Sequence, residues 1–271
     1  MPTTATAKSD RLQGKIAVVM GGGSSNPEGG LSNGQAVAIA FARAGATVVV
    51  VDIKREAAQV TVDIIEREGG IAFAMAADVS KAPDVENVIR TAVEKYGRID
   101  ILHNNVGIEY MGDVVDTPEA DWDRVHDVNI KSVFLACKYA VPEMEKAGGG
   151  TIINISSTAS LKFSDVPYIA YNSSKAALNH MTQIIARQYA PKQIRCNAIL
   201  PGMMDTPHIR TLYKDLPADK FKEVMAGRDA KCPMGRQGTC WDVANAAVFL
   251  ASEDASYING VLLKVDGASS I

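Results

Sequence analysis

Short apolar runs alternate with longer segments of mixed polarity along nearly the whole chain. Each run is rich in Val, Ile and Ala and ends in glycine or a polar residue, a pattern typical of strands buried on both faces. The runs predict seven strands, at residues 16–20, 47–51, 71–76, 99–103, 151–155, 193–200 and 260–265. The mixed segments predict helices at residues 34–44, 55–68, 83–96, about 118–146 and 241–251, and one that carries Tyr171 and ends near residue 189.

Strands that alternate with helices predict right-handed crossovers and a mostly parallel sheet. The predicted class is α/β: a single-domain, Rossmann-type doubly wound fold whose seven-stranded sheet carries helices on both faces. One domain spans residues 1–271, with a polar extension at 1–13 and no linker. Residues 203–237 are polar, mixed and low in strand signal. We expect this segment to bind substrate and to order or close over it.

The beginning of the chain is typical of a dinucleotide-binding unit. Its first strand ends in Gly21, a glycine-rich loop runs to Asn33, and the second strand is closed by Asp52, 18 residues after Gly34. Glycine lets the backbone approach a pyrophosphate, whose charge is stabilised by amides at a helix N-terminus. We expect Gly21, Ser32, Asn33 and Gly34 to bind the cofactor, with Ser32 in the place of the middle glycine.

Asp52 bears on the choice of cofactor. Its carboxylate would accept hydrogen bonds from the adenine ribose and would repel a 2′-phosphate. Lys54 and Arg55 follow it but indicate no definite phosphate clamp, so the sequence favours NAD over NADP. Residues 24–30, with Asn26, Pro27 and Glu28, look like an insertion in the loop, and a flexible surface loop is the simpler interpretation of them.

Tyr171 and Lys175 are four residues apart and therefore lie on one face of a helix. A free tyrosine titrates near pH ~10, and a neighbouring positive charge favours its phenolate. We expect Lys175 to lower the pKa of Tyr171, so that the phenol can exchange a proton with an alcohol or carbonyl. The alternative is a chance pair on a helix surface.

The residues that follow the strands decide between these alternatives. In a parallel sheet the carboxyl ends of the strands meet at one edge, where ligands bind. The residues at that edge are Gly21, Asp52, Asp78, Asn104, Asn105, Ser156, Ser157, Pro201 and Gly202. Polar residues and glycines thus end every strand on the same rim, which favours a functional pair.

With these motifs in this order, the chain resembles the short-chain dehydrogenase/reductase family from Gly14 to Ala268. The matching motifs are Asp78-Val79, Asn104-Asn105-Val106-Gly107, Asn129, Ser157, Tyr171 with Lys175, Pro201-Gly202 with Thr206, and Val265-Asp266-Gly267. No single motif is decisive, but their order and spacing together are highly specific.

The resemblance implies four catalytic roles. Tyr171 would be the acid/base, Lys175 would lower its pKa and bind the nicotinamide ribose, Ser157 would hold the substrate oxygen, and Asn129 would keep a water in a proton relay behind Lys175. Ser157 could otherwise be a strand-end cap and Asn129 an ordinary helix residue.

The resemblance also implies a cofactor-binding set. Asp78 would contact the adenine and Thr206 the carboxamide, although both could be loop caps, and Asp266 is better read as structural. The full set is Gly21, Ser32, Asn33, Gly34, Asp52, Ile53, Asp78, Val79, Asn105, Gly107, Tyr171, Lys175, Pro201, Gly202 and Thr206.

The chain departs from the family pattern at several positions. Met20 precedes Gly21 where the family has threonine, and His103 stands where a small apolar residue is usual. Ser157 and Tyr171 are fourteen residues apart, one more than usual, so a residue must bulge out between Ser160 and Tyr168. Tyr168 has no lysine four residues later and is not expected to act in catalysis.

Composition and charge exclude several other classes of protein. The net charge of −3 indicates no binding to nucleic acid or to an anionic membrane. No apolar run approaches the ~20 residues of a membrane span, and the polar N-terminus does not resemble a secretory signal, so we expect a cytoplasmic protein. Four cysteines and four histidines are scattered without metal-site spacing, so we expect reduced thiols and no metal.

The expected function is NAD(H)-dependent interconversion of a secondary alcohol and a ketone, with Tyr171 as acid/base. The alternatives are a carrier-bound 3-oxoacyl reductase, which would want NADPH and a basic docking patch, and a non-catalytic NAD-binding regulator. We expect the substrate wall to come from Glu109 and Tyr110, from residues 161–168 and from residues 203–237, with Lys162, Asp165, His208 and Arg210 as its charged members. The family resemblance also implies a homotetramer or homodimer.

Overall fold

The computed structural model describes residues 8–24, 30–162, 166–213 and 215–271. The insertion expected around residues 24–30 therefore lies mostly outside the described residues, as does part of the bulge expected between Ser160 and Tyr168. The first half of the chain forms β1 Ile16–Met20, α1 Asn33–Arg43, β2 Thr47–Asp52, α2 Arg55–Arg67, β3 Ile71–Ala76, α3 Ala82–Tyr96, β4 Ile101–Asn104, α4 Glu119–His126, η2 Asp127–Lys131 and α5 Ser132–Lys146. The second half forms β5 Gly150–Ile155, η3 Thr158–Ser160, α6 Ile169–Tyr189, η4 Ala190–Lys192, β6 Ile194–Pro201, β7 Met204–Asp205, α7 Pro207–Leu212, α8 Ala218–Ala230, β8 Gly238–Thr239, α9 Cys240–Ala251, η5 Glu253–Ala255 and β9 Leu262–Val265.

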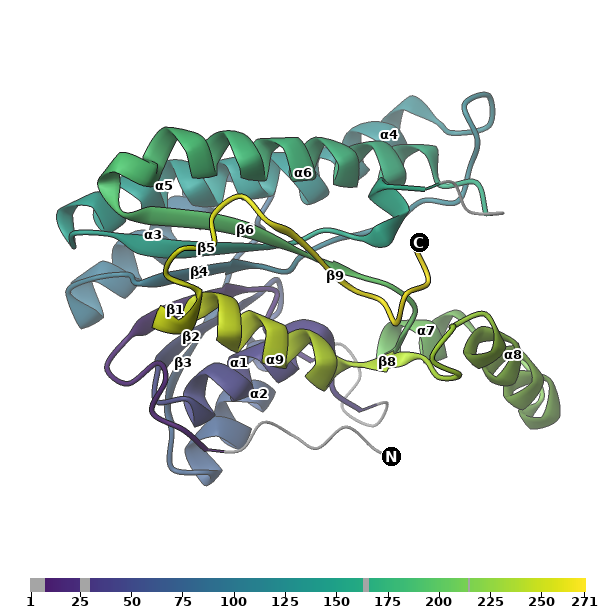
Figure 1. Ribbon diagram of the computed structural model, residues 1–271, viewed down its shortest axis with the longest axis horizontal. Coiled ribbons are helices and arrows are strands. Elements are labelled where there is room, and N and C mark those ends of the chain that lie inside the picture. Colours follow the sequence, from purple (N-terminus) through teal and green to yellow (C-terminus); the bar gives the residue numbers. More distant parts are fainter. Residues whose placement is uncertain (1–7, 25–29, 163–165, 214) are drawn as a thin grey trace.

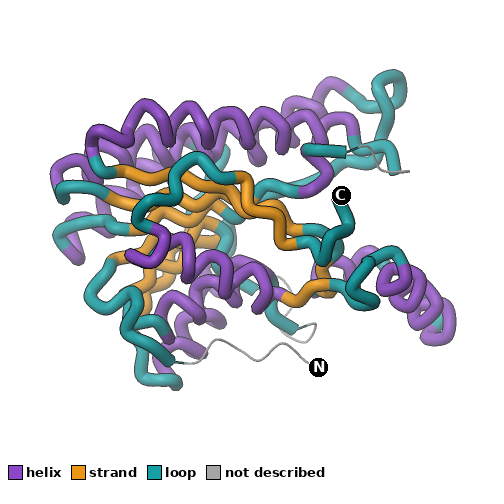
Figure 2. The backbone as a smooth tube through the Cα atoms, viewed as in Figure 1, coloured by secondary structure: helices purple, strands orange, loops and turns teal. Residues whose placement is uncertain are grey.

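Within the described residues, a seven-stranded sheet has the order β3-β2-β1-β4-β5-β6-β9, and every pairing in it is parallel. The chain builds outward from β1 to β3 and then returns to place β4 on the other side of β1. Strand order therefore reverses between β1 and β4, the position where ligands bind in open α/β sheets. The predicted fold class is confirmed (Figure 1, Figure 2).

Side chains alternate across the sheet and fill two cores. In β2, Val48 and Val50 join a cluster with α1, α2 and α9, whereas Val49 and Val51 join a cluster with α3, α5 and α6. Because both faces of the strand are covered, the strand reads as a continuous apolar run in the sequence. Figure 1 shows the two helical layers on either side of the sheet.

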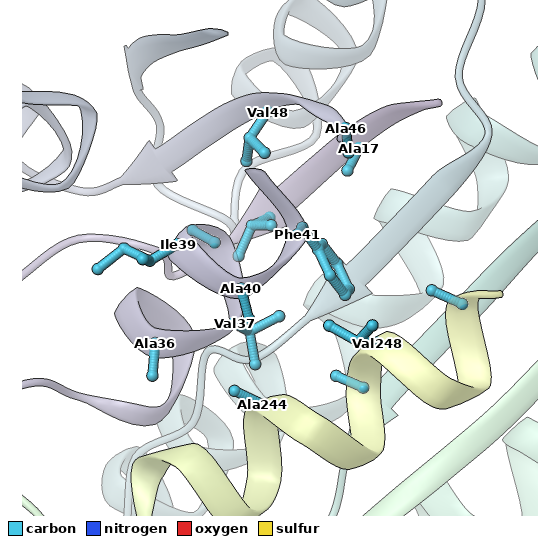
Figure 3. Close-up of a cluster of buried hydrophobic side chains, with 14 of the residues drawn as sticks. Ala17, Ala36, Val37, Ile39, Ala40, Phe41, Ala46, Val48, Ala244 and Val248 are labelled. Carbon is cyan, nitrogen blue, oxygen red and sulfur yellow. The ribbon is translucent and has the colours of Figure 1, made fainter. Parts of the chain in front are cut away.

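The packing of α1 against α9 shows why alanine is so common in these helices. Phe41 is the largest fully buried side chain here and lies beside Val37 of α1. Ala244 and Val248 of α9 face them (Figure 3). Small side chains let the two helix backbones approach closely, which fixes α1 under the loop that follows β1.

Two predicted elements differ in the structure. The long helix predicted for about 118–146 is formed by α4, a π-helical turn at Asp127–Lys131 and α5. Residues 203–237, which lack a clear periodic signal, contain α7, α8 and β7, and β7 pairs with β8. In α8 no residue is buried, so the sequence of that helix carries no apolar stripe to reveal it.

The remaining strands and helices lie within about two residues of their predicted bounds. Among the described residues no helix is sufficiently long and apolar to cross a membrane. All four cysteines are free and buried.

Candidate active site

A cleft of about 1590 Å³ opens at the carboxyl ends of the strands. Its walls come from the loops after β1 to β6 and from α4, α6, α7 and α8. Figure 1 shows α7 and α8 beside this end of the sheet, next to the C-terminus. Most of the predicted site residues line the cleft: Gly21, Ser32, Asn33, Asp52, Ile53, Asp78, Val79, Asn105, Gly107, Ser157, Tyr171, Lys175, Pro201, Gly202 and Thr206.

The loop after β1 is held close to α1 and β4. Gly21 has a φ of +80°, and its carbonyl accepts a hydrogen bond of 3.0 Å from Asn105 Nδ2. A Cβ on Gly34 would lie 2.0 Å from that same carbonyl oxygen. Gly34 is buried and, unlike most of the predicted set, does not line the cleft. The absence of a side chain at this position lets the helix pack closely on the loop.

Ser32 is the N-cap of α1. Its Oγ accepts a hydrogen bond of 3.2 Å from the backbone N–H of Gln35 and donates one of 3.2 Å to the Gly23 carbonyl. The neighbouring Asn33 has a buried Oδ1 with no partner among the described residues. An unpaired buried oxygen beside a glycine-rich loop fits a site that a polar ligand completes.

Asp52 lies at the end of β2, where burial raises the pKa of its carboxyl group. Backbone N–H groups of Lys54, Ile53 and Gly23 act in the opposite direction by stabilising the carboxylate. A Cβ on Gly23 would lie 2.6 Å from Asp52 Oδ2. Gly23 lines the cleft and is missing from the predicted set. The run of three glycines at 21–23 was the available signal.

Asp78 mainly closes its own loop. Its Oδ1 accepts hydrogen bonds from Ser80 N at 3.0 Å and from Ser80 Oγ at 2.6 Å, and these bonds lower the pKa of the carboxyl group. Lys81 Nζ lies 3.7 Å from Oδ2. The loop-cap alternative thus describes one of its oxygens, although the residue still lines the cleft beside Val79.

Tyr171 and Lys175 project from α6 into the cleft, with Lys175 Nζ lying 5.7 Å from the centre of the Tyr171 ring. The ammonium group donates a hydrogen bond of 2.8 Å to the Ile155 carbonyl. A Cβ on Gly107 would lie 3.1 Å from Nζ, so a side chain at this position would crowd the lysine.

Burial dominates the titration of this pair. It raises the pKa of Tyr171 to about 12 and lowers the pKa of Lys175 to about 8. A hydrogen bond with the Ser157 side chain acts against the shift of Tyr171. The loss of water is the largest influence on the phenol in this structure, so its pKa lies above the ordinary value.

The two serines after β5 have different surroundings. Ser156 is 3% exposed and donates a hydrogen bond of 3.2 Å to the Lys175 carbonyl, so it fixes α6 to the sheet. Ser157 is half-buried, lines the cleft and accepts a hydrogen bond of 3.1 Å from Ala159 N. Tyr168 lies edge-on to Tyr171, with ring centres 6.3 Å apart, and also lines the cleft.

Asn129 is fully buried within the π-helical turn. Its Nδ2 donates to the Ile108 carbonyl at 2.9 Å and to Ser174 Oγ at 3.0 Å, while Oδ1 accepts from Ile108 N at 2.8 Å. Both donors of the amide are filled by protein. In the part of the chain that the structure describes, the second lone pair of Oδ1 is what remains for the expected water.

The outer half of the cleft differs in part from the expected substrate wall. Glu109 and His208 line it and form an ion pair, with Oε1 and Nε2 3.1 Å apart. Tyr110 and Arg210 do not line it, and Arg210 instead contacts Asp205 at 2.9 Å. Asp165 lies outside the described residues. Cleft residues that the sequence did not reveal include Ala120, Asp123, Arg124, Asp127 and Val128.

The residues after β6 lie on the floor of the cleft. The Pro201 carbonyl accepts a hydrogen bond of 3.3 Å from Thr158 Oγ1, and a Cβ on Gly202 would lie 2.7 Å from that of Asp266. Asp266 accepts hydrogen bonds from Ala268 and Ser270, so it holds the C-terminal turn. No group of three or more potential metal ligands occurs in the described ranges.

Comparison with known proteins places this chain in a family. Residues 31–269 match a family model described as enoyl-(acyl carrier protein) reductase. A 2,5-dichloro-2,5-cyclohexadiene-1,4-diol dehydrogenase from Sphingobium indicum is 37% identical, over 97% of this chain and 98% of its own. A crystal structure of a short-chain dehydrogenase/reductase from Burkholderia xenovorans matches with a TM-score of 0.89 at 37% identity, covering 97% of this chain and 98% of that one.

A second solved structure is a 7α-hydroxysteroid dehydrogenase in complex with NADH and 7-oxoglycochenodeoxycholic acid. It matches with a TM-score of 0.84 at 36% identity and covers 96% of each chain. Identity at this level extends over essentially the full length of these relatives, and their fold is the same. The chain belongs to the short-chain dehydrogenase/reductase family of oxidoreductases.

Proposed function

We propose that this protein is an NAD(H)-dependent oxidoreductase that interconverts a secondary alcohol and a ketone, with Tyr171 as the acid/base. The observation that carries the proposal is the meeting of Ser157, Tyr171 and Lys175 in one cleft, beside the glycine-rich loop. A bound nicotinamide would supply the hydride chemistry. The protein supplies position, hydrogen bonds and the proton.

The catalytic residues play different parts in the reduction of a ketone and in the oxidation of an alcohol. With a pKa of about 12, the phenol of Tyr171 is protonated at neutral pH and can donate its proton to the oxygen of a ketone during reduction. Oxidation requires the phenolate, which the buried cation of Lys175 would stabilise. Ser157 would donate a hydrogen bond to the substrate oxygen, where negative charge develops.

The Asp52 carboxylate supports the choice of NAD. It stands at the end of β2 within the cleft, and Gly23 leaves its Oδ2 uncovered by any Cβ. A ribose hydroxyl could donate to it, whereas a 2′-phosphate would be repelled. Lys175 Nζ and the unpaired Asn33 Oδ1 are further groups that fit a nicotinamide dinucleotide.

The test is turnover by Tyr171→Phe, measured by the absorbance of reduced cofactor over a panel of secondary alcohols and ketones. We expect a loss of about 10²–10⁴-fold in kcat/KM. Tyr168→Phe is the matched control because it removes a neighbouring phenol of the same cleft. Equal turnover by the Tyr171 variant and the wild type would sink the assignment, whereas no turnover by either protein would favour the role of non-catalytic NAD-binding regulator.

A second candidate is the reduction of carrier-bound 3-oxoacyl groups. It is favoured by the description of the matching family model and by Lys162, Arg228 and Lys231, which line the outer cleft as a basic docking surface would. This reaction predicts turnover of a 3-oxoacyl thioester with NADPH. Preference for NADP over NAD in the wild type would favour this candidate and would contradict the role given to Asp52.

A further inference from the structure

The segment after β4 presents Glu109 to the outer cleft from a fixed backbone. The preceding residue, Ile108, has both its N–H and its carbonyl bound by the Asn129 amide, at 2.8 Å and 2.9 Å. Because that amide is fully buried, the backbone from which Glu109 projects has little freedom. The Glu109 carboxylate therefore projects into the cleft from a fixed backbone position, as a group that recognises substrate must.

The two carboxylate oxygens of Glu109 are used unequally. Oε1 accepts from His208 Nε2 at 3.1 Å. Across residues 8–24, 30–162, 166–213 and 215–271, no donor reaches Oε2. The Glu109 side chain is 27% exposed and that of His208 is 61% exposed. Within the described residues, Oε2 is thus an acceptor without a protein partner.

The charge of Glu109 reaches the reacting groups. Glu109 lines the same cleft as Tyr171 and Tyr168, and its charge raises the pKa of both phenols. A substrate whose oxygen lies at Ser157 and Tyr171 would therefore extend toward Glu109. Covering the carboxylate with an apolar group would remove its water without replacing it, and an anionic group would be repelled.

We propose that Glu109 is a specificity-determining residue that accepts a hydrogen bond from a second hydroxyl group of the substrate, and that His208 is the positioning residue that holds its other oxygen. This inference rests on the proposed function and deepens it: the substrate class is a diol or polyol rather than a simple alcohol. A neutral hydroxyl suits this site because His208 Nε2 already lies 3.1 Å from Oε1, so one further hydrogen-bond donor completes the carboxylate.

The experiment compares kcat/KM for cyclohexanol with that for the 1,2-, 1,3- and 1,4-cyclohexanediols, with aminocyclohexanols as the cationic arm. We expect at least one diol to exceed cyclohexanol by about tenfold or more in the wild type. Glu109→Leu should bring the ratio of kcat/KM for that diol to kcat/KM for cyclohexanol down to about one, whatever its effect on the rate with cyclohexanol itself. Preference for the aminocyclohexanols over the diols would overturn the assignment to a neutral hydroxyl.

The matched control is Asp205→Asn. Asp205 forms an ion pair with Arg210 in the same segment as His208 but does not line the cleft. Its loss should leave the ratio of diol to cyclohexanol unchanged. His208→Leu should reduce the ratio of diol to cyclohexanol. His208→Gln keeps a side chain that can donate a hydrogen bond to Glu109, so it should retain more of that ratio than His208→Leu does. A diol preference that is absent from the wild type, or that survives Glu109→Leu, overturns the proposal.

A binding measurement separates failure of this inference from failure of the proposed function. Isothermal titration calorimetry of the same compounds into Tyr171→Phe saturated with NADH measures the difference in affinity between the diols and cyclohexanol. This difference reports on Glu109 and does not depend on turnover. If Tyr171→Phe turns over as the wild type does, the catalytic assignment fails but the binding ratio still tests Glu109. If binding shows no difference between the diols and cyclohexanol, the role of Glu109 is refuted whatever the activity.

Discussion

His103 is fully buried in β4, edge-on to Phe41 with ring centres 5.9 Å apart. Neither ring nitrogen has a hydrogen-bond partner among the described residues, and burial lowers the pKa of the imidazole to about 3. The sequence marked this position as unusual, because a small apolar residue is typical there. What the sequence could not reveal is that the ring enters a core whose other members are all apolar.

The buried imidazole predicts a pH dependence of stability. Its pKa is lower in the folded state than the unfolded value of about 6.5, so below pH ~6.5 the unfolded chain binds a proton that the folded chain does not. The contribution of His103 is therefore present above pH ~6.5 and is lost as the pH falls toward 3, by about 1.4 kcal/mol per pH unit within that window.

Urea denaturation from pH 7 to pH 4 measures this effect. His103→Leu should flatten the acid loss of the free energy of unfolding, whereas the exposed His180→Gln should leave it unchanged. If the free energy of unfolding falls equally steeply with decreasing pH in the wild type and in His103→Leu, carboxyl groups alone account for the loss of stability in acid.

At the scale of the element, the π-helical turn between α4 and α5 shows where sequence-based prediction stops. The apolar periodicity correctly indicated a helical stretch from about 118 to 146, but a single widened turn does not disturb that pattern enough to be seen. The turn buries Asn129 against Ile108. The motif singled out Asn129 in the sequence, whereas its hydrogen bonds to the backbone of Ile108 could be seen only in the structure.

Asn129→Ala should destabilise the protein because it removes the hydrogen bonds from the Asn129 amide to the Ile108 backbone. The substitution removes the partner of Ile108 N–H and C=O, which costs about 1–3 kcal/mol in the free energy of unfolding for two partly buried backbone groups. It should also lower kcat/KM, since Gly107 and Lys175 adjoin the same amide.

Denaturant unfolding combined with kinetics checks this prediction against Asn172→Ala. Asn172 is a helix asparagine whose buried Oδ1 already lacks a partner within the described residues, so its removal should cost much less. Equal destabilisation by the two variants would contradict the role assigned to the Asn129 amide.

At the scale of the whole molecule, the topology explains why the candidate site could be outlined from sequence. Parallel strands bring their carboxyl ends together, so Asp52, Ser157 and Gly202 needed only a correct strand assignment to be placed in one cleft. The ion pair of Glu109 with His208 joins residues 99 positions apart and follows no motif. Contacts of that kind depend on how α7 folds back over the sheet.

The exposed apolar side chains on α4, α5 and α6 support assembly of the chain into a dimer or tetramer. Trp122, Phe134 and Ile184 are 37%, 53% and 43% exposed. Light scattering should give a multiple of 28.9 kDa, and Phe134→Lys should reduce it. Ile71→Lys, at an exposed apolar residue of β3 on another part of the molecule, is the control. A monomeric wild type would contradict the prediction.

The segment containing α7 and α8 is weakly anchored by apolar contacts in the part of the chain that the structure describes. In α8 no side chain is buried, and the segment is held by polar contacts such as those from Arg228 to Gln237 at 2.6 Å and from Arg210 to Asp205 at 2.9 Å. Its inner residues line the outer cleft, so a ligand would add the apolar contacts that the helix lacks. Binding should therefore stabilise this segment more than any part of the core.

Hydrogen exchange measured by mass spectrometry tests this expectation. With NADH and a ketone bound, amides of residues 207–230 should exchange at least about tenfold more slowly, because closure replaces local opening. Amides of α9, which is packed on α1 away from the cleft, should not change. Protection by NADH alone would assign the ordering to the cofactor rather than to the substrate. Unchanged exchange in 207–230 with both ligands bound would mean that the segment is a fixed wall, and specificity would then rest on side chains such as Glu109 without any closing motion.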